Sequence, residues 1–300
     1  MNRFLFARYC CCLAICLPSA LFAQAPQTWQ AFTDNILVWN PAAAGSHDAT
    51  SIGAFYRRQW TEVPDGPSTA AISVHAPLWN PRLALGGTLD HDRLGPLSRT
   101  ALRGQFAWRV VGQRGTLSLG LSAGAVLEEA DFANLDATLS GDPAFDIQPA
   151  DRWDWDAGAG IFYYNAHWMV GAAAQDLADD RRYNAVGAAR IDIGPSFALR
   201  PLAMIRVPEQ GVWQADAGMR LIFAESFRVG GAWRSNNAWS LDMGYRIREK
   251  SAYGWREWGF GYAYQVAQPE LRGAFGGTHE VFLQARFNRD RTQEINPRFF

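Results

Sequence analysis

The chain has 300 residues, of which 19% are charged, and a formal net charge of −1 at pH 7. This neutral balance excludes the basic surface on which nucleic-acid binding depends, so we expect no nucleic-acid partner. Aromatic residues make up 13% of the chain and 28 residues are Gly, which is typical of the interfacial belts and tight β-packing of membrane proteins.

Residues 1–25 have the layout of a secretory signal peptide. Arg3 and Arg8 precede an apolar run over residues 10–21, and Ala23-Gln24-Ala25 offers a small-x-small cleavage site. The apolar run is shorter than the about 20 residues that a membrane-spanning helix needs. All four cysteines lie inside this run. We therefore expect export, cleavage of the signal peptide and a mature chain without a disulfide.

Residues 26–50 lack a regular hydrophobic period. Asn40-Pro41 interrupts the segment and Gly45-Ser46 turns the chain. We predict an irregular N-terminal segment that either plugs the lumen of a barrel or lies at its periplasmic mouth.

Residues 51–288 form a series of segments in which apolar and polar residues alternate. In the stretch 239–248, an apolar parity from Trp239 to Ile247 alternates with a polar parity from Ser240 to Arg248. This period of two indicates strands with different surroundings on their two faces. The predicted strands cover residues 51–60, 68–76, 82–93, 98–109, 116–127, 154–164, 166–176, 182–192, 195–206, 211–223, 226–235, 238–248, 254–265 and 278–288.

The connectors between these strands are asymmetric in length. The two longest, around residues 128–153 and 267–277, fall on one side, whereas most connectors on the other side are short. Long outer loops and short periplasmic turns are typical of bacterial outer-membrane barrels. We therefore predict an all-β protein, a transmembrane antiparallel β-barrel of about 14 strands of the outer-membrane type, with residues 289–300 as a periplasmic tail.

A soluble β-sandwich or barrel is the alternative. Its apolar parity would face a core, whereas here that parity carries repeated Trp, Phe and Leu with almost no charge over strands long enough to cross a bilayer. The membrane barrel, in contact with outer-membrane lipid, is the favoured reading.

The inward parity of the predicted barrel carries charges of both signs. Its members are Arg57, Arg103, Arg109, Arg200, Arg206, Arg220, Arg228, Arg234, Arg246, Arg248, Asp154, Asp156, Asp216, Asp242, Glu257 and Glu280. Buried charges persist when they are paired, so a mixed lining favours a filled lumen braced by ion pairs over an arginine-lined anion channel.

A hydrolase at the barrel rim is a further alternative. His75, His91, His167 and His279 are the candidate bases, and Asp90-His91-Asp92 lies near Ser98 at the predicted outer rim. A nucleophile needs a base within hydrogen-bond reach and a third group that orients it. Adjacent residues of a strand point to opposite faces and do not converge on one metal ion. We expect no catalytic residues, no metal and no cofactor.

Several short blocks resemble a known family. Residues 39–46 (WNPAAAGS) resemble the N-P-A-Y-A-G-S stretch near the mature start of the PorP/SprF family, outer-membrane components of the type IX secretion system of Bacteroidota. Residues 55–60 (FYRRQW), 66–69 (GPST) and 73–77 (SVHAP) resemble its next block, and residues 145–149 and 157–163 its middle. Residues 277–280 (GTHE) resemble its last strand and residues 296–300 its tail. The chain departs from the family at Ala43, where the family has Tyr, and at Gly66, which stands one place late.

The residues that carry this resemblance most specifically are Asn40, Pro41, Gly45, Tyr56, Arg57, Gln59, Trp60, Gly66, Pro67, His75, Pro77, His279 and Glu280. Because a barrel closes between its first and last strands, we predict an ion pair between Arg57 and Glu280 across that seam.

The resemblance implies a non-enzymatic component of type IX secretion, exported to the Gram-negative outer membrane, that assists the secretion or surface anchoring of cargo proteins. The partners implied are other type IX components, cargo with C-terminal sorting domains and a periplasmic peptidoglycan-binding protein. A porin or substrate-specific channel is the alternative function, and the rim hydrolase comes after it.

Overall fold

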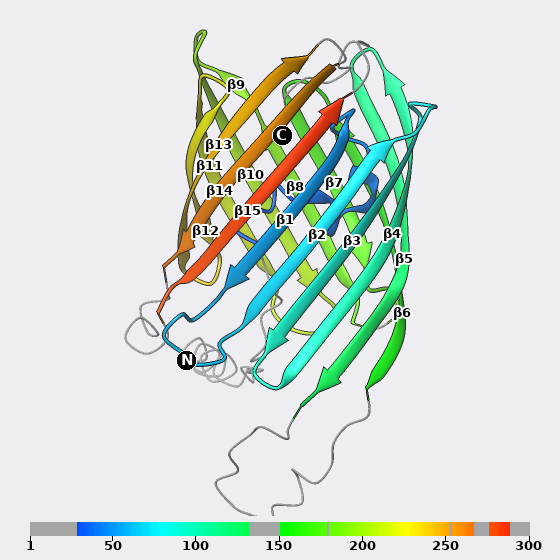
Figure 1. Ribbon diagram of the computed structural model, residues 1–300, viewed down its shortest axis with the longest axis vertical. Helices are drawn as coiled ribbons and strands as arrows, with labels where there is room; N and C mark the ends of the chain where they lie inside the picture. Colours follow the sequence, from blue (N-terminus) through cyan, green and yellow to red (C-terminus); the bar gives the residue numbers. More distant parts are fainter. Residues whose placement is uncertain (1–28, 132–150, 179, 252–253, 267–275, 289–300) are drawn as a thin grey trace, which may run out of the picture.

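The computed structural model describes residues 29–131, 151–178, 180–251, 254–266 and 276–288, and these form a closed antiparallel β-barrel of 14 strands (Figure 1). β8 and β9 both pair with β10 and occupy one position in the barrel. This confirms the predicted fold. The strands are β1 (Thr50–Arg58), β2 (Ser68–Pro77), β3 (Leu83–Leu94), β4 (Leu97–Gly112), β5 (Gly115–Ala130), β6 (Arg152–Tyr164), β7 (Trp168–Gln175), β8 (Arg182–Ala189), β9 (Ile191–Asp192), β10 (Phe197–Pro208), β11 (Gln214–Phe223), β12 (Phe227–Arg234), β13 (Ala238–Ser251), β14 (Gly254–Gln265) and β15 (Thr278–Asn288).

The barrel closes between its first and last strands. β1 pairs with β2 on one side and with β15 on the other, in a register that sets Tyr56 opposite Val281 and Arg57 opposite Glu280. Apart from β8 and β9, which both pair with β10, each remaining strand pairs with its neighbours in sequence. The described strands therefore leave no open sheet edge, as a lipid environment requires.

Side chains alternate strictly across the wall. Leu121 on β5 and Trp239 on β13 face outward and are 63% and 61% exposed, whereas Arg109 on β4 faces the lumen and is 0% exposed. Apolar residues outside and polar residues inside reverse the arrangement of a soluble β domain. This parity is that of a transmembrane barrel.

The two ends of the barrel differ. β1 begins and β15 ends at one of them, which we call the C-terminal mouth (upper end in Figure 1). The connectors over residues 59–67, 131–151 and 266–277 start and finish at the opposite end, which we call the long-loop mouth.

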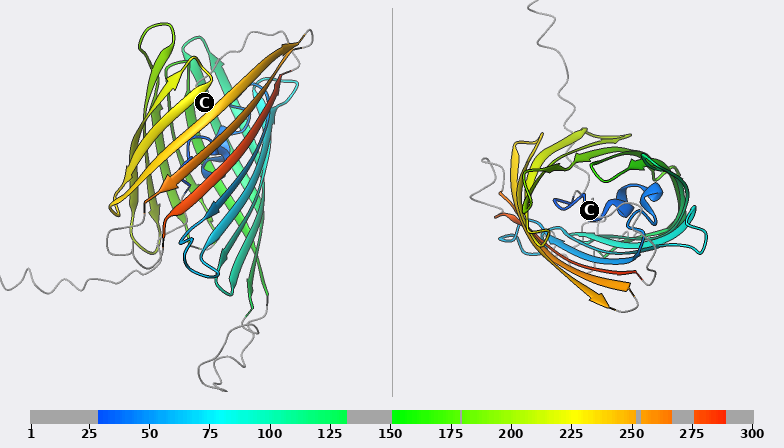
Figure 2. Two further views of the ribbon diagram at one scale, coloured as in Figure 1. Left: turned by 60° about the vertical axis from the view of Figure 1, so that its left-hand side comes forward. Right: turned by 90° about the horizontal axis from the view of Figure 1, so that it is seen from above.

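Residues 29–49 lie inside the barrel, and we call them the plug (Figure 2). The plug contains one turn of helix, α2 (Ile36–Trp39), followed by the 3-10 turn η1 (Pro41–Ala43). Most of its side chains, apolar and polar alike, are buried. No helix in the described ranges has the length and apolar character needed to cross a membrane.

Some strand ends differ from those predicted. β1 ends at Arg58 rather than at residue 60, because Trp60 adopts a left-handed φ of 51° that breaks the extended backbone. β4 and β5 extend to 16 residues each. The alternation of apolar and polar residues predicts the position of a strand better than it predicts the strand's ends, because pairing with a neighbouring strand extends it beyond the alternating segment.

Candidate functional site

The plug runs along the barrel from one mouth to the other. Near the long-loop mouth, the backbone N–H groups of Gln30 and Ala31 donate to the Glu280 carboxylate over 2.7 and 2.9 Å. Near the C-terminal mouth, Asp48 forms an ion pair with Arg109, and its carbonyl accepts from Asn288 Nδ2 at 3.3 Å. The wall therefore binds both ends of the plug.

A first set of contacts, the charged anchor, binds the plug to β11, β12 and β15. Asp34 forms ion pairs with Arg220, over 2.9 Å, and with Arg228, and its carbonyl accepts from Gln284 Nε2 at 2.6 Å. The side chains of Asp34 and Arg220 are 3% and 2% exposed. Arg220 also contacts Asp242 at 2.8 Å.

The charged anchor keeps its carboxylate ionised. Burial alone raises the pKa of a carboxyl group, but the positive charges of Arg228 and Arg220 outweigh it and lower the pKa of Asp34 well below its ordinary value. The anchor is therefore an ion pair throughout the physiological range.

A second set of contacts, the glycine seat, holds the plug against β5, β6 and β7. Asn40 Nδ2 donates to the backbone carbonyls of Ile161, over 2.9 Å, and of Ala172, over 3.3 Å. Asn40 Oδ1 accepts from Ala42 N–H at 2.9 Å and caps η1, which begins at Pro41. The Asn-Pro-Ala sequence thus builds a tight turn that also binds the wall.

The strands have glycine, and thus no side chain, where this turn contacts them. A Cβ atom added at Gly120 would collide with Ala42, and one at Gly160 would collide with Asn40. Gly171 on β7 completes the seat, since its Cβ would lie 2.8 Å from Asn40 Nδ2. Only glycine lets the plug backbone and the Asn40 side chain approach the strands this closely.

Apolar packing accompanies both contact sets. Trp29 packs edge-on against Phe55 of β1, and the Arg206 guanidinium lies 5.5 Å from the Trp39 ring centre. One buried cluster joins plug side chains, including Phe32 and Ile36, to wall residues of β6, β7 and β10. The plug is thus integrated into the barrel core.

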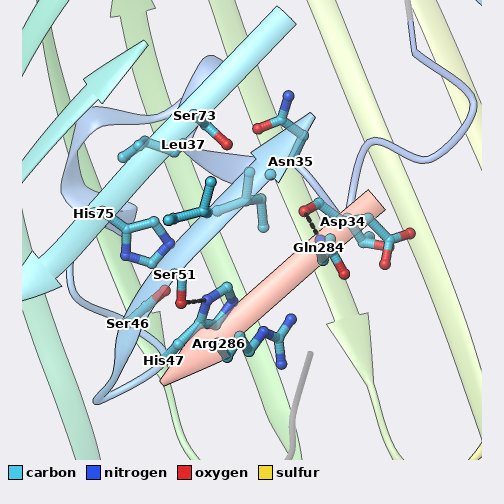
Figure 3. A pocket seen from close by; sticks show the side chains of 14 residues that line it. Asp34, Asn35, Leu37, Ser46, His47, Ser51, Ser73, His75, Gln284 and Arg286 are labelled. Carbon is cyan, nitrogen blue, oxygen red and sulfur yellow. Dashed lines mark hydrogen bonds between the residues drawn. The ribbon is translucent and has the colours of Figure 1, made fainter. Parts of the chain in front are cut away.

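A small polar cavity lies between the plug, β1, β2 and β15 (Figure 3). His47 Nδ1 lies 2.8 Å from Ser51 Oγ, and its ring centre is 4.8 Å from that of His75. Burial, together with the charge of nearby Arg286, lowers the pKa of His47 well below its ordinary value of 6.5. His47 is therefore neutral in the seated plug.

The sequence-predicted residues fall into three places. Asn40, Pro41, Gly45 and His75 lie at contacts between the plug and the wall. Asn40 bonds to β6 and β7, whereas Gly45, with a φ of 72°, donates its N–H to His75 Nδ1 of β2 at 2.9 Å. Pro77 ends β2 beside Gly45. The other two places are the first hairpin and the seam between β1 and β15.

The first hairpin holds four of these residues. Gln59 N–H donates to the Pro67 carbonyl at 2.8 Å, Trp60 takes its left-handed φ there, and a Cβ at Gly66 would meet the Gln59 carbonyl oxygen at 2.8 Å. These residues shape the turn between β1 and β2.

At the seam, Tyr56 faces outward and is 47% exposed, whereas Arg57 faces the lumen and is 3% exposed. Arg57 and Glu280 are register partners, but the Glu280 oxygens accept the plug N–H groups described above. The Glu280 carboxylate therefore binds the plug rather than forming the predicted ion pair with Arg57. His279 Nδ1 lies 2.6 Å from the Tyr262 hydroxyl.

The residues proposed for a rim hydrolase point apart. Asp90 forms an ion pair with Arg103 inside the lumen, whereas His91 Nδ1 pairs with Thr100 Oγ1 on the exposed face over 2.8 Å. Arg103 also contacts Asp156 and, over 3.1 Å, Asp176. Asp90 thus braces the lumen and does not orient His91.

The sequence pattern singled out Arg220 and Arg228 on the wall, and the family resemblance singled out Asn40 and Pro41. Neither identified the residues that they contact. Asp34 carried a signal, because it is the one charged residue between positions 29 and 46, and a lone charge in a segment buried inside a barrel needs a partner. Gly120, Gly160 and Gly171 carried no such signal among 28 glycines.

Comparison with solved structures gives remote similarity to outer-membrane barrels. Omp33 of Acinetobacter baumannii is 10% identical, with a TM-score of 0.44, over 81% of this chain and 99% of that one. The CymD monoaromatic hydrocarbon channel is 12% identical, with a TM-score of 0.48, over 85% and 92%. At these scores the similarities carry no functional argument. No match was found among curated protein sequences.

A family model gives the decisive match. The model described as "Type IX secretion system membrane protein PorP/SprF" matches residues 21–285. This span contains the plug and all the described strands except the last residues of β15. Family and fold together place the protein in the outer membrane. The chain belongs to the PorP/SprF family of type IX secretion system membrane proteins.

Proposed function

We propose that this barrel serves type IX secretion as a sealed, non-conducting scaffold that assists the secretion or surface anchoring of cargo proteins. The observation that carries the proposal is the plug, which runs from mouth to mouth and is bound by the charged anchor and the glycine seat. A transport pore would need an open path through the space that these residues occupy.

The proposed partners lie on both sides of the membrane. Cargo proteins with C-terminal sorting domains and other type IX components are the partners that family membership supports. We place the periplasm at the C-terminal mouth, because long connectors are outer ones in bacterial barrels. A peptidoglycan-binding protein that reaches this mouth would connect the barrel to the periplasmic machinery.

A non-enzymatic role fits a secretion-system membrane protein. Replacing His91 by Ala tests the hydrolase alternative. We expect unchanged hydrolysis of lipid and peptide substrates, and a loss of hydrolysis in this variant would restore that alternative.

The scaffold is tested by two measurements on the whole protein. In planar bilayers, we expect the purified wild-type barrel to give no steady current, and a variant lacking residues 29–47 to conduct. In cells that lack the gene, we expect fewer proteins with C-terminal sorting domains at the surface, measured by mass spectrometry, and recovery upon complementation.

The outcomes separate the two candidate functions. A steady wild-type current with unchanged surface cargo would contradict the scaffold and favour the porin. Current from the variant without residues 29–47 shows that the assay detects an open lumen of this barrel.

A further inference from the structure

A second hollow lies in the lumen on the side of β10–β15, across from the glycine seat. It is narrow and partly open to solvent. Four arginines line it, Arg190, Arg200, Arg228 and Arg246, together with a single carboxylate, Glu225. Glu225 belongs to the short turn between β11 and β12, so the hollow opens at the C-terminal mouth.

The four guanidiniums lie at increasing depth. The side chains of Arg190 and Arg246 are 13% and 17% exposed, and a solute that enters from the C-terminal mouth meets them first. Arg228 and Arg200 lie deeper and are buried. Guanidinium groups therefore lie along the hollow from its rim to its floor.

The nearby carboxylates are shared between several arginines. Glu257 contacts Arg246 at 3.4 Å, Arg248 at 3.0 Å and Arg286 at 3.2 Å. In the same way, Asp34 contacts both Arg220 and Arg228. Arg190 in turn contacts Asp192, at 2.8 Å, and Glu225. Within the lining of the hollow, four guanidiniums thus stand against one carboxylate.

We propose that this hollow, the arginine pocket, binds carboxylate side chains of an acidic segment that a protein partner inserts from the C-terminal mouth. A guanidinium presents paired N–H donors that match the two oxygens of a carboxylate. The barrel wall separates these arginines from the bilayer, so a lipid headgroup would have to pull its acyl chains out of the membrane to reach them. Charge complementarity and access both favour a peptide.

The pocket deepens the proposed function, and it rests on that function only for the assignment of the partner to the periplasmic machinery. Binding of an acidic segment is a property of the barrel itself. A binding measurement on the purified protein therefore succeeds or fails independently of any secretion assay.

The test uses the full-length protein in zwitterionic detergent and a fluorescein-labelled peptide of ten glutamates. Fluorescence anisotropy measures the Kd. We expect Arg246→Gln to weaken binding about tenfold, the loss of roughly one charge-assisted contact. Binding should also weaken as salt rises, because screening reduces charge attraction.

Arg248→Gln is the matched control. Arg248 lies two residues further along β13 and contacts the same Glu257, but it does not line the pocket. Either substitution leaves Glu257 with two arginines, so we expect both barrels to fold and Arg248→Gln to bind like wild type. If Arg246→Gln does not fold, as judged by heat-modifiable migration on gels, Arg190→Gln at the rim takes its place.

Three outcomes would overturn the proposal. Equal weakening by Arg246→Gln and Arg248→Gln would mean that the effect is general electrostatics. Equally tight binding of a ten-lysine peptide would show that binding does not depend on negative charge in the peptide. Displacement of the peptide by millimolar inorganic phosphate or by anionic lipid vesicles, with the same sensitivity to Arg246→Gln, would assign the pocket to phosphate groups.

Discussion

The charged anchor and the glycine seat bind the same plug to opposite walls by different physical means. The anchor depends on charge: one carboxylate, Asp34, satisfies two buried guanidiniums. The seat depends on shape: the turn from Asn40 to Ala42 fits against strands that have no side chain at the point of contact. Removal of a group should therefore damage the anchor most, and addition of a group should damage the seat most.

This difference also bears on release of the plug. A buried ion pair is costly to break because it leaves charges without partners in a poorly hydrated lumen. A steric fit forbids extra atoms but resists withdrawal only through its packing and hydrogen bonds. The anchor is thus the stronger of the two barriers, and three experiments on the plug measure the contrast.

The largest effect is expected for Asp34→Ala. It leaves Arg228 and part of Arg220 uncompensated, and breaking a buried pair in this way costs about 3–5 kcal/mol. We expect the plug to leave the lumen for part of the time and planar bilayers to show transient current. Asn35→Ala is the control, because no described residue hydrogen-bonds the Asn35 amide; current of equal size from both variants would contradict the anchor.

A smaller effect is expected for Gly160→Val. The new side chain would collide with Asn40, and overpacking of this kind costs about 1–3 kcal/mol. We expect less frequent openings than for Asp34→Ala and a lower Tm. Gly104→Val is matched to it, since a Cβ at Gly104 on β4 meets only a carbonyl oxygen at 3.8 Å. An unchanged Tm for Gly160→Val would mean that the seat is not tightly packed.

The smallest effect is a dependence on pH through His47. The seated plug holds the pKa of His47 below 6.5, whereas a released plug would regain that ordinary value. The seated state is thus fully stable above pH 6.5 and loses stability as the pH falls below it, by about 1.4 kcal/mol per unit. The ion pairs of Asp34 persist over this window, because its pKa is depressed.

The measurement is the opening frequency of the barrel between pH 7.5 and pH 5.5. We expect wild-type openings to become more frequent on acidification and the dependence to flatten in His47→Gln. His75 and Arg286 surround His47 and remain in this variant. An equally steep dependence in His47→Gln would assign the titration to another group.

The amino-acid sequence alone determined the barrel and the direction of nearly every wall side chain. Leu102 and Arg103 point to opposite sides because successive residues of a strand do so, and this period of two is visible in any short window of the chain. Closure between the ends of the chain also predicted that Arg57 lies opposite Glu280.

Only the tertiary structure decided what occupies the lumen. Asp34 meets its arginines 186 and 194 residues further along the chain, and no local pattern encodes that distance. The Glu280 carboxylate binds plug N–H groups, and three of many glycines form the seat. The interior of a closed barrel brings residues from every strand together, so contacts there depend on the whole ring.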